Sequence, residues 1–438
     1  MANRFFSWTT RFGILLLLIA TVFSLLQKQN LPKLSFEGFL GIANTTLLLF
    51  LFVLTVRHFL VLFFSSQEEI KRESIQNNFT FTEGISILVP AYNEELVISD
   101  TIKSLKNLEY PNFEVIIIDD GSTDETSNRA RILTKDDPRF RIFKCENAGK
   151  ASALNLGIHK SQHNFFFCMD ADSQISPQSL SFGMRHFQDP AVGAVAGAVH
   201  VLNSNKILGR FQSLEYLTGL NFFKSAQSFL GMVTIIPGPS GLFRKEILQK
   251  LNGYQSDTFA EDADITLRIG MDGHKIVYEP LMEVHTEVPD KMSDLIKQRY
   301  RWNRGILQAT KKHLGKLLHP FSNPRAFLLM IYMLAETIIF PILNLSVLFL
   351  SLFYAFSSAD FSTISIWFLQ LTLLDLAILM FALTDLRWSL FYVFFAVINR
   401  FTYSFFQDTI KLLSSIEEIF SVKMSWGKLD RISGGNRK

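Results

Sequence analysis

The sequence predicts an α/β domain with a mostly parallel sheet, flanked on both sides by transmembrane α-helices. Three observations lead to this fold class. Apolar residues are concentrated near the two ends of the 438-residue chain, and a more polar stretch lies between them. Within that stretch, strand-like apolar runs alternate with helical patterns, as in parallel sheets with helical crossovers. Acidic residues directly follow several of these runs.

Composition narrows the class of protein. Hydrophobic residues make up 48% of the chain and charged residues 19%, against roughly 25% charged residues in soluble proteins. Mean hydropathy is +0.21. A net charge of +3 is too small to favour nucleic acid as a partner. The two cysteines, Cys145 and Cys168, are too few for a disulfide framework or a metal cluster, so we expect free thiols with packing roles.

Five apolar runs are candidates for membrane spans, since a helix needs about 20 apolar residues to cross a bilayer. Two precede the polar stretch and three follow it: residues 12–26, 39–55, 327–356, 364–383 and 389–406. The first is short enough for a signal peptide, but no small-residue cleavage site follows it. We therefore expect the first two runs to form a hairpin. The predicted segments are residues 1–66, 67–325 and 326–438.

Basic residues orient this arrangement. They flank the first two runs on the sides away from the hairpin turn, at Arg4, Arg11, Arg57, Lys71 and Arg72. Such residues favour the cytoplasmic side, so the central domain is expected to be cytosolic. The predicted location is a multi-pass protein of the bacterial inner membrane. The orientation of the C-terminal end stays open. Three spans after a cytosolic domain would place the tail outside, whereas the basic residues of the tail favour the cytoplasmic side.

Four features refine the membrane segments. Pro341 predicts a kink in its helix, and Asp375 predicts a helix that faces other protein rather than lipid. Residues 58–64 and 409–420 are predicted as helices that lie on the membrane surface.

Four short apolar runs of the central segment are predicted strands: residues 85–89, 114–118, 141–144 and 164–169. Helical patterns over residues 94–105 and 150–160 alternate with them. In a doubly wound sheet, ligands bind outside the carboxyl ends of the strands. Carboxylates lie at those ends: Asp119, Asp120, Asp170 and Asp172.

Asp170 and Asp172 form a D-x-D pattern after the last of these strands. Two carboxylates at this spacing can share a divalent cation that also binds phosphate oxygens. The pattern alone is weak, because about one D-x-D is expected by chance in a chain of this length. A turn with two solvated acids is the alternative at this point.

Five further motifs surround the D-x-D pattern in order. They are Pro90-Ala-Tyr-Asn-Glu94, Asp119-Asp-Gly-Ser122, Asn147-Ala-Gly-Lys-Ala-Ser-Ala-Leu-Asn155, Ala260-Glu-Asp262 and Gln298-Arg-Tyr-Arg-Trp302. The set strongly resembles the processive membrane glycosyltransferases of family 2, which have the GT-A fold and a Q-x-x-R-W signature. Within this group the chain most resembles bacterial poly-β-1,6-N-acetylglucosamine synthases, and chitin, hyaluronan and cellulose synthases are related.

The resemblance implies a UDP-sugar donor, with UDP-N-acetylglucosamine as the first candidate. It also implies a Mg²⁺ or Mn²⁺ cofactor on Asp170 and Asp172. Arg301 would bond the diphosphate, because a guanidinium can donate to two phosphate oxygens at once. The residues expected to bind the nucleotide-sugar are Pro90, Tyr92, Glu94, Asp119, Asp120, Lys150, Asp170, Gln298, Arg299 and Arg301.

The resemblance also makes Asp262 the catalytic base, with Glu261 beside it as a second catalytic acid. The base would take a proton from the acceptor hydroxyl as that oxygen attacks the anomeric carbon. Attack opposite the departing UDP inverts the stereocentre and yields a β-linked product. Ala260 stands where the family has threonine, which changes a supporting position and leaves both acids intact. The residues expected to bind the acceptor are Trp302, Gly238, Ser240 and Gly241.

The acceptor stays open. The Q-x-x-R-W signature implies processive extension of a polysaccharide that the spans move across the membrane, with a small accessory subunit as a candidate partner. The same chemistry on a membrane lipid is one alternative, and a non-enzymatic partner or transporter is another. Basic residues near 297–316 are expected to contact anionic lipid. The aromatic stretch 208–229 is predicted as an amphipathic packing helix rather than a sugar cleft.

Overall fold

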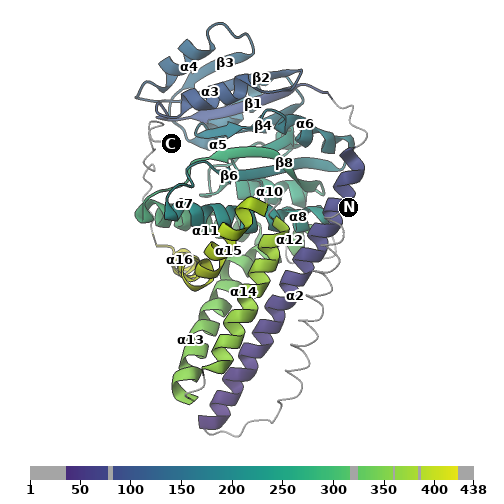
Figure 1. The fold of residues 1–438 in the computed structure, drawn as a ribbon. Helices are drawn as coiled ribbons and strands as arrows, with labels where there is room; N and C mark the ends of the chain where they lie inside the picture. Colours follow the sequence, from purple (N-terminus) through teal and green to yellow (C-terminus); the bar gives the residue numbers. More distant parts are fainter. Residues whose placement is uncertain (1–35, 77–81, 316–323, 359–360, 383–385, 423–438) are drawn as a thin grey trace.

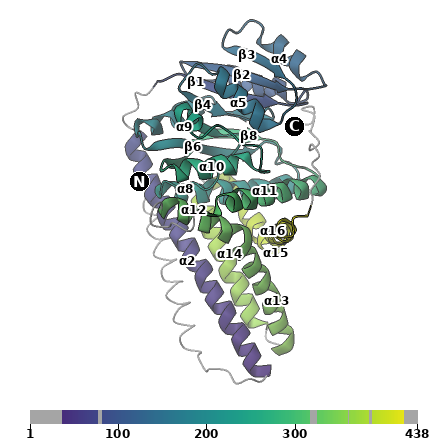
Figure 2. The same cartoon turned by 180° about the vertical axis from the view of Figure 1, so that it is seen from behind.

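The computed structural model describes residues 36–76, 82–315, 324–358, 361–382 and 386–422. It has two parts, a domain built on one β-sheet and a group of helices that projects away from one side of it (Figure 1). Figure 2 shows the same arrangement from behind. The first expected membrane run, residues 12–26, lies outside the described residues.

One half of the sheet is parallel, and its four strands are the predicted ones. The order is β3-β2-β1-β4, with β1 paired in parallel to both β2 and β4, and β2 paired in parallel to β3. The strands are continuous apolar runs because helices cover both faces of the sheet. Their bounds are Ile85–Ala91 for β1, Phe113–Asp120 for β2, Phe140–Cys145 for β3 and Phe165–Cys168 for β4.

Three helices belong to this half of the domain, since parallel strands require crossover connections. They are α3 (Ile98–Lys106), α4 (Thr126–Thr134) and α5 (Lys150–Lys160). Two apolar cores fill the space between the sheet and its covering helices. The crossovers bring the carboxyl ends of β1, β2 and β4 to one edge of the sheet, where the conserved geometry of such folds places ligands.

The other half of the sheet corrects the prediction of a mostly parallel sheet. The order continues β4-β7-β6-β8-β5, with β7 antiparallel to both of its neighbours, β5 antiparallel to β8, and β6 parallel to β8. The sheet is mixed because the chain leaves β6 through a helical excursion and re-enters between β4 and β6 in the opposite direction. The bounds are Ser173–Ile175 for β5, Val192–Val201 for β6, Gly241–Arg244 for β7 and Lys275–Thr286 for β8.

The helical excursion after β6 is the predicted packing helix of residues 208–229. It consists of α7 (Ile207–Glu215), a π-helical segment η2 (Tyr216–Phe222) and α8 (Phe223–Phe229). α8 packs between β8 and the long helix α2. π-Helical turns inside helices are frequent at functional sites. The remaining helices of the domain are α6 (Ser179–Met184), the 3₁₀ turn η1 (Arg185–Gln188), α9 (Lys245–Lys250), α10 (Glu261–Met271) and α11 (Met292–Lys312).

The first projecting helix corrects a second prediction. α2 runs without interruption over Phe36–Gln76, so residues 58–64 do not form a separate surface helix. No Gly or Pro interrupts this part of the chain, and Val61 and Leu62 are buried. The helix therefore continues through the segment until it reaches the sheet domain.

The second projecting helix is irregular just before Pro341. It consists of α12 (Pro324–Leu334), a π-helical segment η4 (Ala335–Ile339) and α13 (Phe340–Ser358). Proline cannot donate a backbone hydrogen bond to the preceding turn, which accounts for an irregular ladder at this place. Two described helices, Thr45–Arg72 and Pro324–Ser357, are long and apolar enough to cross a membrane by length and composition.

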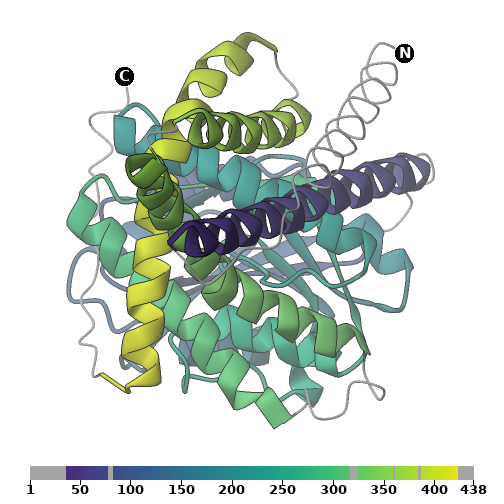
Figure 3. The ribbon, with the colours of Figure 1, turned by 90° about the horizontal axis from the view of Figure 1, so that it is seen from below.

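Three further helices complete the described chain: α14 (Ser362–Ala382), α15 (Leu386–Phe401) and α16 (Tyr403–Ile419). Asp375 of α14 accepts a hydrogen bond from Arg400 Nε of α15 at 2.7 Å and lies 3.7 Å from His58 Nε2 of α2. This confirms that Asp375 faces protein. Seen from below, α16 crosses the underside of the sheet domain (Figure 3), where it packs against α11 and α13.

Candidate active site

The loops that follow β1 and β2 are joined by hydrogen bonds. Asn93 has a φ of 51°, a left-handed conformation that asparagine tolerates, and its side-chain oxygen accepts from the Thr123 N–H at 2.8 Å. The Ser122 hydroxyl in turn accepts from the Asn93 N–H at 3.0 Å. The joined loops bury Glu94 and leave Tyr92 39% exposed. Pro90 lies within β1 itself, opposite Ile118, so Tyr92 is the motif residue that is open to a ligand.

The two acids at the end of β2 shape the neighbouring loops. Asp120 accepts hydrogen bonds from the backbone N–H groups of Ala148 and Gly149, each at 2.9 Å. Gly149 has a φ of +88°, a conformation that other residues rarely adopt. Asp119 accepts from the Ser122 N–H at 2.8 Å. Both carboxylates are buried, and their contacts with a nucleobase stay a prediction.

Lys150 connects the D-x-D turn to the acids of α10. Its Nζ lies 2.5 Å from Asp170 Oδ1 and 3.6 Å from Glu261 Oε1. Burial disfavours the charge on Lys150, but these two carboxylates outweigh it and raise the lysine pKa. Gly238 lies against the pair, because a Cβ there would come within 2.8 Å of Lys150 Nζ and 3.6 Å of Asp170 Oδ2. A side chain at this position would displace the end of Lys150 from its present place.

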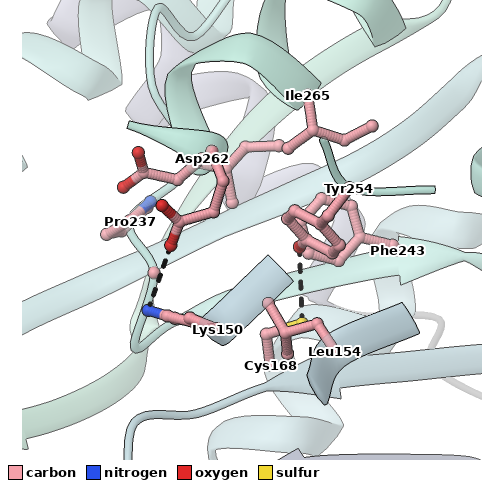
Figure 4. Close-up of a pocket in the computed structure, with 11 residues that line it drawn as sticks. Lys150, Leu154, Cys168, Pro237, Phe243, Tyr254, Asp262 and Ile265 are labelled. Atoms are coloured by element: carbon pink, nitrogen blue, oxygen red, sulfur yellow. Dashed lines mark hydrogen bonds and ion pairs between the residues drawn. The ribbon is translucent and has the colours of Figure 1, made fainter. Parts of the chain in front are cut away.

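Asp262, the expected base, lies in the first turn of α10. Burial and the adjacent charge of Glu261 raise the pKa of Asp262 to about 6, although Lys150 and Arg301 act in the opposite direction. A general base works best when its pKa is near the working pH. Asp262 is therefore ionised at neutral pH and close to its titration range. Figure 4 shows Lys150 and Asp262 at the same cavity.

This cavity measures about 10 Å³, which is roughly the room that one water requires. Its wall is apolar apart from the charged residues at its mouth, and includes Leu154, Cys168, Pro237, Phe243, Tyr254 and Ile265. The Cys168 thiol and the Tyr254 hydroxyl are 3.4 Å apart, as Figure 4 shows. Burial raises the pKa of Cys168 to about 12, so the thiol is neutral and has the expected packing role. No motif marked Tyr254 in the sequence.

The D-x-D acids offer oxygen ligands. Asp172 Oδ1 accepts from the hydroxyl groups of Ser173 at 3.1 Å and Thr286 at 3.4 Å, and Asp170 bonds Lys150. Within the described part of the chain, no three or more His, Cys, Asp or Glu side chains gather as a metal site. Mg²⁺ commonly takes one or two carboxylates and completes its shell with water and substrate phosphates. The donor set therefore fits a cation that binds together with a diphosphate.

Arg301 and Trp302 are neighbours on α11. Arg301 lies close enough to Asp262 to lower the pKa of that acid. Trp302 packs in an apolar cluster with Val199, Tyr216, Leu220 and Val288. The Arg299 guanidinium lies over the Trp302 ring, 4.2 Å from its centre. One face of the indole is thus covered by an arginine of its own helix.

Arg299 was expected to bind the nucleotide-sugar, but its contacts in the structure are with other residues of the protein. It is buried, and its guanidinium donates to Glu215 at 2.7 Å and to Gln298 at 2.5 Å. Tyr403 of α16 donates to the same Glu215 oxygen at 2.7 Å. Residues two apart on a helix do not share a face, so Arg299 points to this buried cluster while Arg301 faces the base. Arg299 thus holds α11 in place from its buried side, and the donor contact expected of Gln298 stays a prediction.

Two of the expected acceptor residues are also corrected. Ser240 has 0% of its surface exposed. Gly241 begins β7, and a Cβ there would come within 2.7 Å of the Phe243 ring. The chain enters the centre of the sheet directly after Gly238, so of the three residues only Gly238 lines the cavity. Ser240 and Gly241 have packing roles.

Comparison with known proteins shows what this part of the chain is similar to. Residues 86–251 match the model of glycosyl transferase family 2. The matched part includes the loops after β1 and β2, Lys150 and the D-x-D turn, and it ends ten residues before Glu261.

Two curated relatives are similar to this chain over about half of its length. The poly-beta-1,6-N-acetyl-D-glucosamine synthase of Staphylococcus aureus (strain COL) is 34% identical over 224 residues, which are 51% of this chain and 54% of the relative. The synthase of the same name from Staphylococcus epidermidis is 36% identical over 225 residues. The match thus spans about half the length of these relatives.

The structural comparison shows the GT-A glycosyltransferase fold. The chain resembles the mannosyltransferase PcManGT of Pyrobaculum calidifontis, whose structure was solved with GDP-Man and Mn²⁺. The TM-score is 0.59 at 18% identity, and the match covers 85% of this chain and 99% of the other.

Proposed function

We propose that this chain is an inverting glycosyltransferase that transfers a sugar from a UDP-sugar to the end of a growing β-linked polysaccharide. UDP-N-acetylglucosamine is the first candidate donor. One observation carries the proposal: Lys150 lies between the D-x-D acid Asp170 and Glu261, beside Asp262. This arrangement brings a cation, a candidate metal ligand and a candidate base to one cavity at the strand ends.

The chemistry follows from the protonation states of these groups. Asp262, with a pKa of about 6, is ionised at neutral pH and can accept the proton of the acceptor hydroxyl. That oxygen then forms the new glycosidic bond while the bond from the anomeric carbon to UDP breaks. Lys150 and Arg301 stabilise the negative charge of the departing diphosphate, since preorganised cations are most effective where charge develops.

Asp170 and Asp172 would hold Mg²⁺ or Mn²⁺ on the donor side. The bound cation would supply a positive charge to the diphosphate oxygens. The oxygen-only donor set supports this assignment, because hard divalent cations prefer such ligands.

We further propose that the protein spans a membrane several times, with the glycosyltransferase domain in the cytoplasm. The two long apolar helices support this placement. A second cavity, of about 250 Å³, lies between these helices and the domain. Its lining is rich in polar and charged groups, including Glu215, Asp375, Arg400, Asp408 and Lys411. Side chains of this kind can form hydrogen bonds with the hydroxyl groups of a sugar, which supports a polysaccharide as the acceptor.

A panel of UDP-sugars tests the proposal in membranes that contain the protein with Mg²⁺ or Mn²⁺, scored by UDP release. We expect release from one donor, and a product that stays in the aqueous phase and lengthens with time. The substitution Asp262→Asn should lower the rate roughly 10²- to 10⁴-fold and leave UDP binding within about twofold of wild type.

Asp136→Asn is a matched control, because Asp136 is exposed in the same domain. Release of UDP from none of the donors, or wild-type turnover by the Asp262 variant, would refute the proposed activity. A product that extracts into organic solvent would instead indicate a lipid acceptor.

A further inference from the structure

Lys224 is an unusual residue of α8. It lies in the second position of α8, and only 5% of its surface is exposed. Among the described residues, no hydrogen bond or ion pair joins its ammonium group to another side chain or to the backbone. Lysine is almost never buried without a partner, because removing an unpaired charge from water is costly. A buried lysine of this kind either destabilises the fold or binds a molecule outside the described chain.

The neighbours of Lys224 along the helix show which way it faces. One turn before it, Asn221 exchanges two hydrogen bonds with the backbone of Val199 in β6, at 3.1 and 3.0 Å. One turn after it, the Ser228 hydroxyl accepts from the backbone N–H of Tyr278 in β8 at 2.8 Å. Residues three and four apart share a helix face, so Lys224 belongs to the face that looks toward the sheet.

This face is next to the residues of the acceptor side. Leu220, one turn before Lys224, packs in the cluster that contains Trp302. On the other side, the charge of Asp262 acts on Lys224 and opposes the effect of burial, which lowers the lysine pKa to about 7. Lys224 thus lies near enough to Asp262 to feel its charge, one helix turn from the cluster that contains Trp302.

Two lysines therefore approach the base from different elements. Lys150 comes from α5 and binds Asp170 on the donor side, whereas Lys224 comes from α8 and has no acid within ion-pair distance in the described chain. Figures 1 and 2 both show α10, which carries Asp262, between α5 and α8. The donor side already has its cation, so the position of Lys224 suits the other substrate.

We propose that Lys224 binds the acceptor: its side-chain nitrogen donates a hydrogen bond to a hydroxyl or acetamido oxygen of the terminal acceptor sugar and so orients the attacking hydroxyl toward Asp262. This inference rests on the proposed glycosyl transfer. Neutral sugar oxygens are suitable partners for a lysine in this environment, because they offer an acceptor without adding a second buried charge. The acceptor sugar would lie between Lys224 and the Trp302 cluster.

The test separates the two substrates of the reaction. Lys224→Met keeps the length of the side chain and removes the donor, and Lys224→Arg keeps a donor. The wild type and both variants are assayed as full-length protein for two reactions: hydrolysis of the UDP-sugar by water, and transfer to a short β-linked N-acetylglucosamine oligosaccharide. Lys206→Met is the matched control, because Lys206 precedes the same helical excursion and is exposed, with 60% of its side chain accessible.

We expect Lys224→Met to lower kcat/KM for the oligosaccharide about ten- to a hundredfold, as for loss of a hydrogen bond to a charged group. Hydrolysis of the UDP-sugar and the KM of the donor should stay within about twofold of wild type. Lys224→Arg should recover part of the transfer rate. The Met variant should unfold at the same or a higher temperature, since it removes a buried unpaired charge.

Three results would overturn the inference while the proposed function stands. They are an unchanged kcat/KM for the oligosaccharide in Lys224→Met, an equal loss of hydrolysis and transfer, and a large fall in unfolding temperature, which would assign Lys224 a structural role. A wild type that releases no UDP from any donor refutes the proposed function itself, and the inference with it.

Discussion

The donor side and the acceptor side of the site are built differently. Apart from Arg301, the donor side comes from the loops of residues 90–172. Hydrogen bonds between adjacent loops hold it, such as those that the side chains of Asn93 and Asp120 accept from backbone N–H groups. The acceptor side is assembled from η2, α8, α10, α11 and α16, which are distant in sequence. Its contacts are buried ion pairs, such as Arg299 with Glu215 and Arg304 with Glu418.

The two sides should therefore respond differently to substitutions. Loops joined by hydrogen bonds from backbone N–H groups to the side chains of adjacent loops keep their shape through contacts within the donor side. A helix held by buried ion pairs depends on both partners, because removal of one leaves an uncompensated charge. Substitutions on the donor side should therefore act locally, on donor binding, and those on the acceptor side should also change stability.

The largest effect in this comparison is expected for Asp120→Asn. The Ala148 and Gly149 N–H groups bond different oxygens of the carboxylate, and the amide replaces one of these acceptors with an NH2 donor. Each lost hydrogen bond to a charged group costs about 1.5 to 3 kcal/mol, and the KM of the UDP-sugar should rise roughly tenfold or more. Steady-state kinetics with each substrate varied in turn measure this.

The KM of the oligosaccharide should not change in Asp120→Asn, and Asp136→Asn should leave both constants as they are. A donor KM equal to wild type would mean that the Asp120 hydrogen bonds do not hold the donor loop in its binding shape. An equal rise in both KM values would mean that the two sides are not independent.

A smaller effect is expected where α16 holds α11. Glu418 accepts from Arg304 Nε at 2.7 Å and from Gln308 at 3.1 Å, and Arg304 is buried. Glu418→Gln removes the charge opposite this arginine, so the free energy of unfolding should fall by about 1 to 3 kcal/mol. Thermal unfolding in detergent measures the loss, and the KM of the oligosaccharide should rise with it.

Glu417 provides the control for Glu418. It lies on the same turn, 3.9 Å from Arg304 Nη1, with 39% of its side chain exposed. Exposed pairs contribute roughly 0 to 1 kcal/mol, so Glu417→Gln should have little effect. Equal losses of unfolding free energy in the two variants would contradict the conclusion that Glu418, rather than Glu417, holds Arg304 in place.

The smallest effect concerns the pH dependence of the base. Asp262 must be ionised to accept a proton, so kcat should fall as the pH drops through about 6, the pKa of Asp262. The charge of Glu261 raises that pKa, and Glu261→Gln removes the charge. The acidic limb of the rate profile should therefore move to lower pH. Glu246→Gln, at an exposed position of α9, should leave the profile unchanged, and a shift to higher pH in the Glu261 variant would contradict the electrostatic account.

The parallel half of the sheet was predictable because its strands are short apolar runs that end at acids or proline, and its helix α5 begins at the predicted Lys150. The mixed half was not. β6 is rich in alanine and glycine, which are poor strand formers, and β8 contains Pro280 and an irregular register against β6. The direction of β7 in the sheet depends on where the helices after β6 end. No local sequence pattern predicts that position.

The site was predictable to the extent that motifs carry it. Lys150, Asp170, Gly238, Glu261 and Asp262 come together as neighbours of one cavity or ion-pair cluster. Arg299 belongs to one of these motifs but points into the protein, and Ser240 and Gly241 are buried in or beside β7. A sequence pattern does not state which helix face or strand side is open. Lys224 lies in a stretch that was predicted only to pack, so the sequence did not mark it.

The uninterrupted helix α2 gives the acceptor side a mechanical connection. Its 41 residues extend over roughly 60 Å at 1.5 Å per residue, and near its upper end Glu68 accepts a hydrogen bond from Ser228 of α8 at 2.7 Å. A long uninterrupted helix moves as one body when it tilts. In the membrane placement proposed above, a bilayer that changes thickness would tilt α2 and load α8, which carries Lys224 and is itself bonded to the sheet through Ser228.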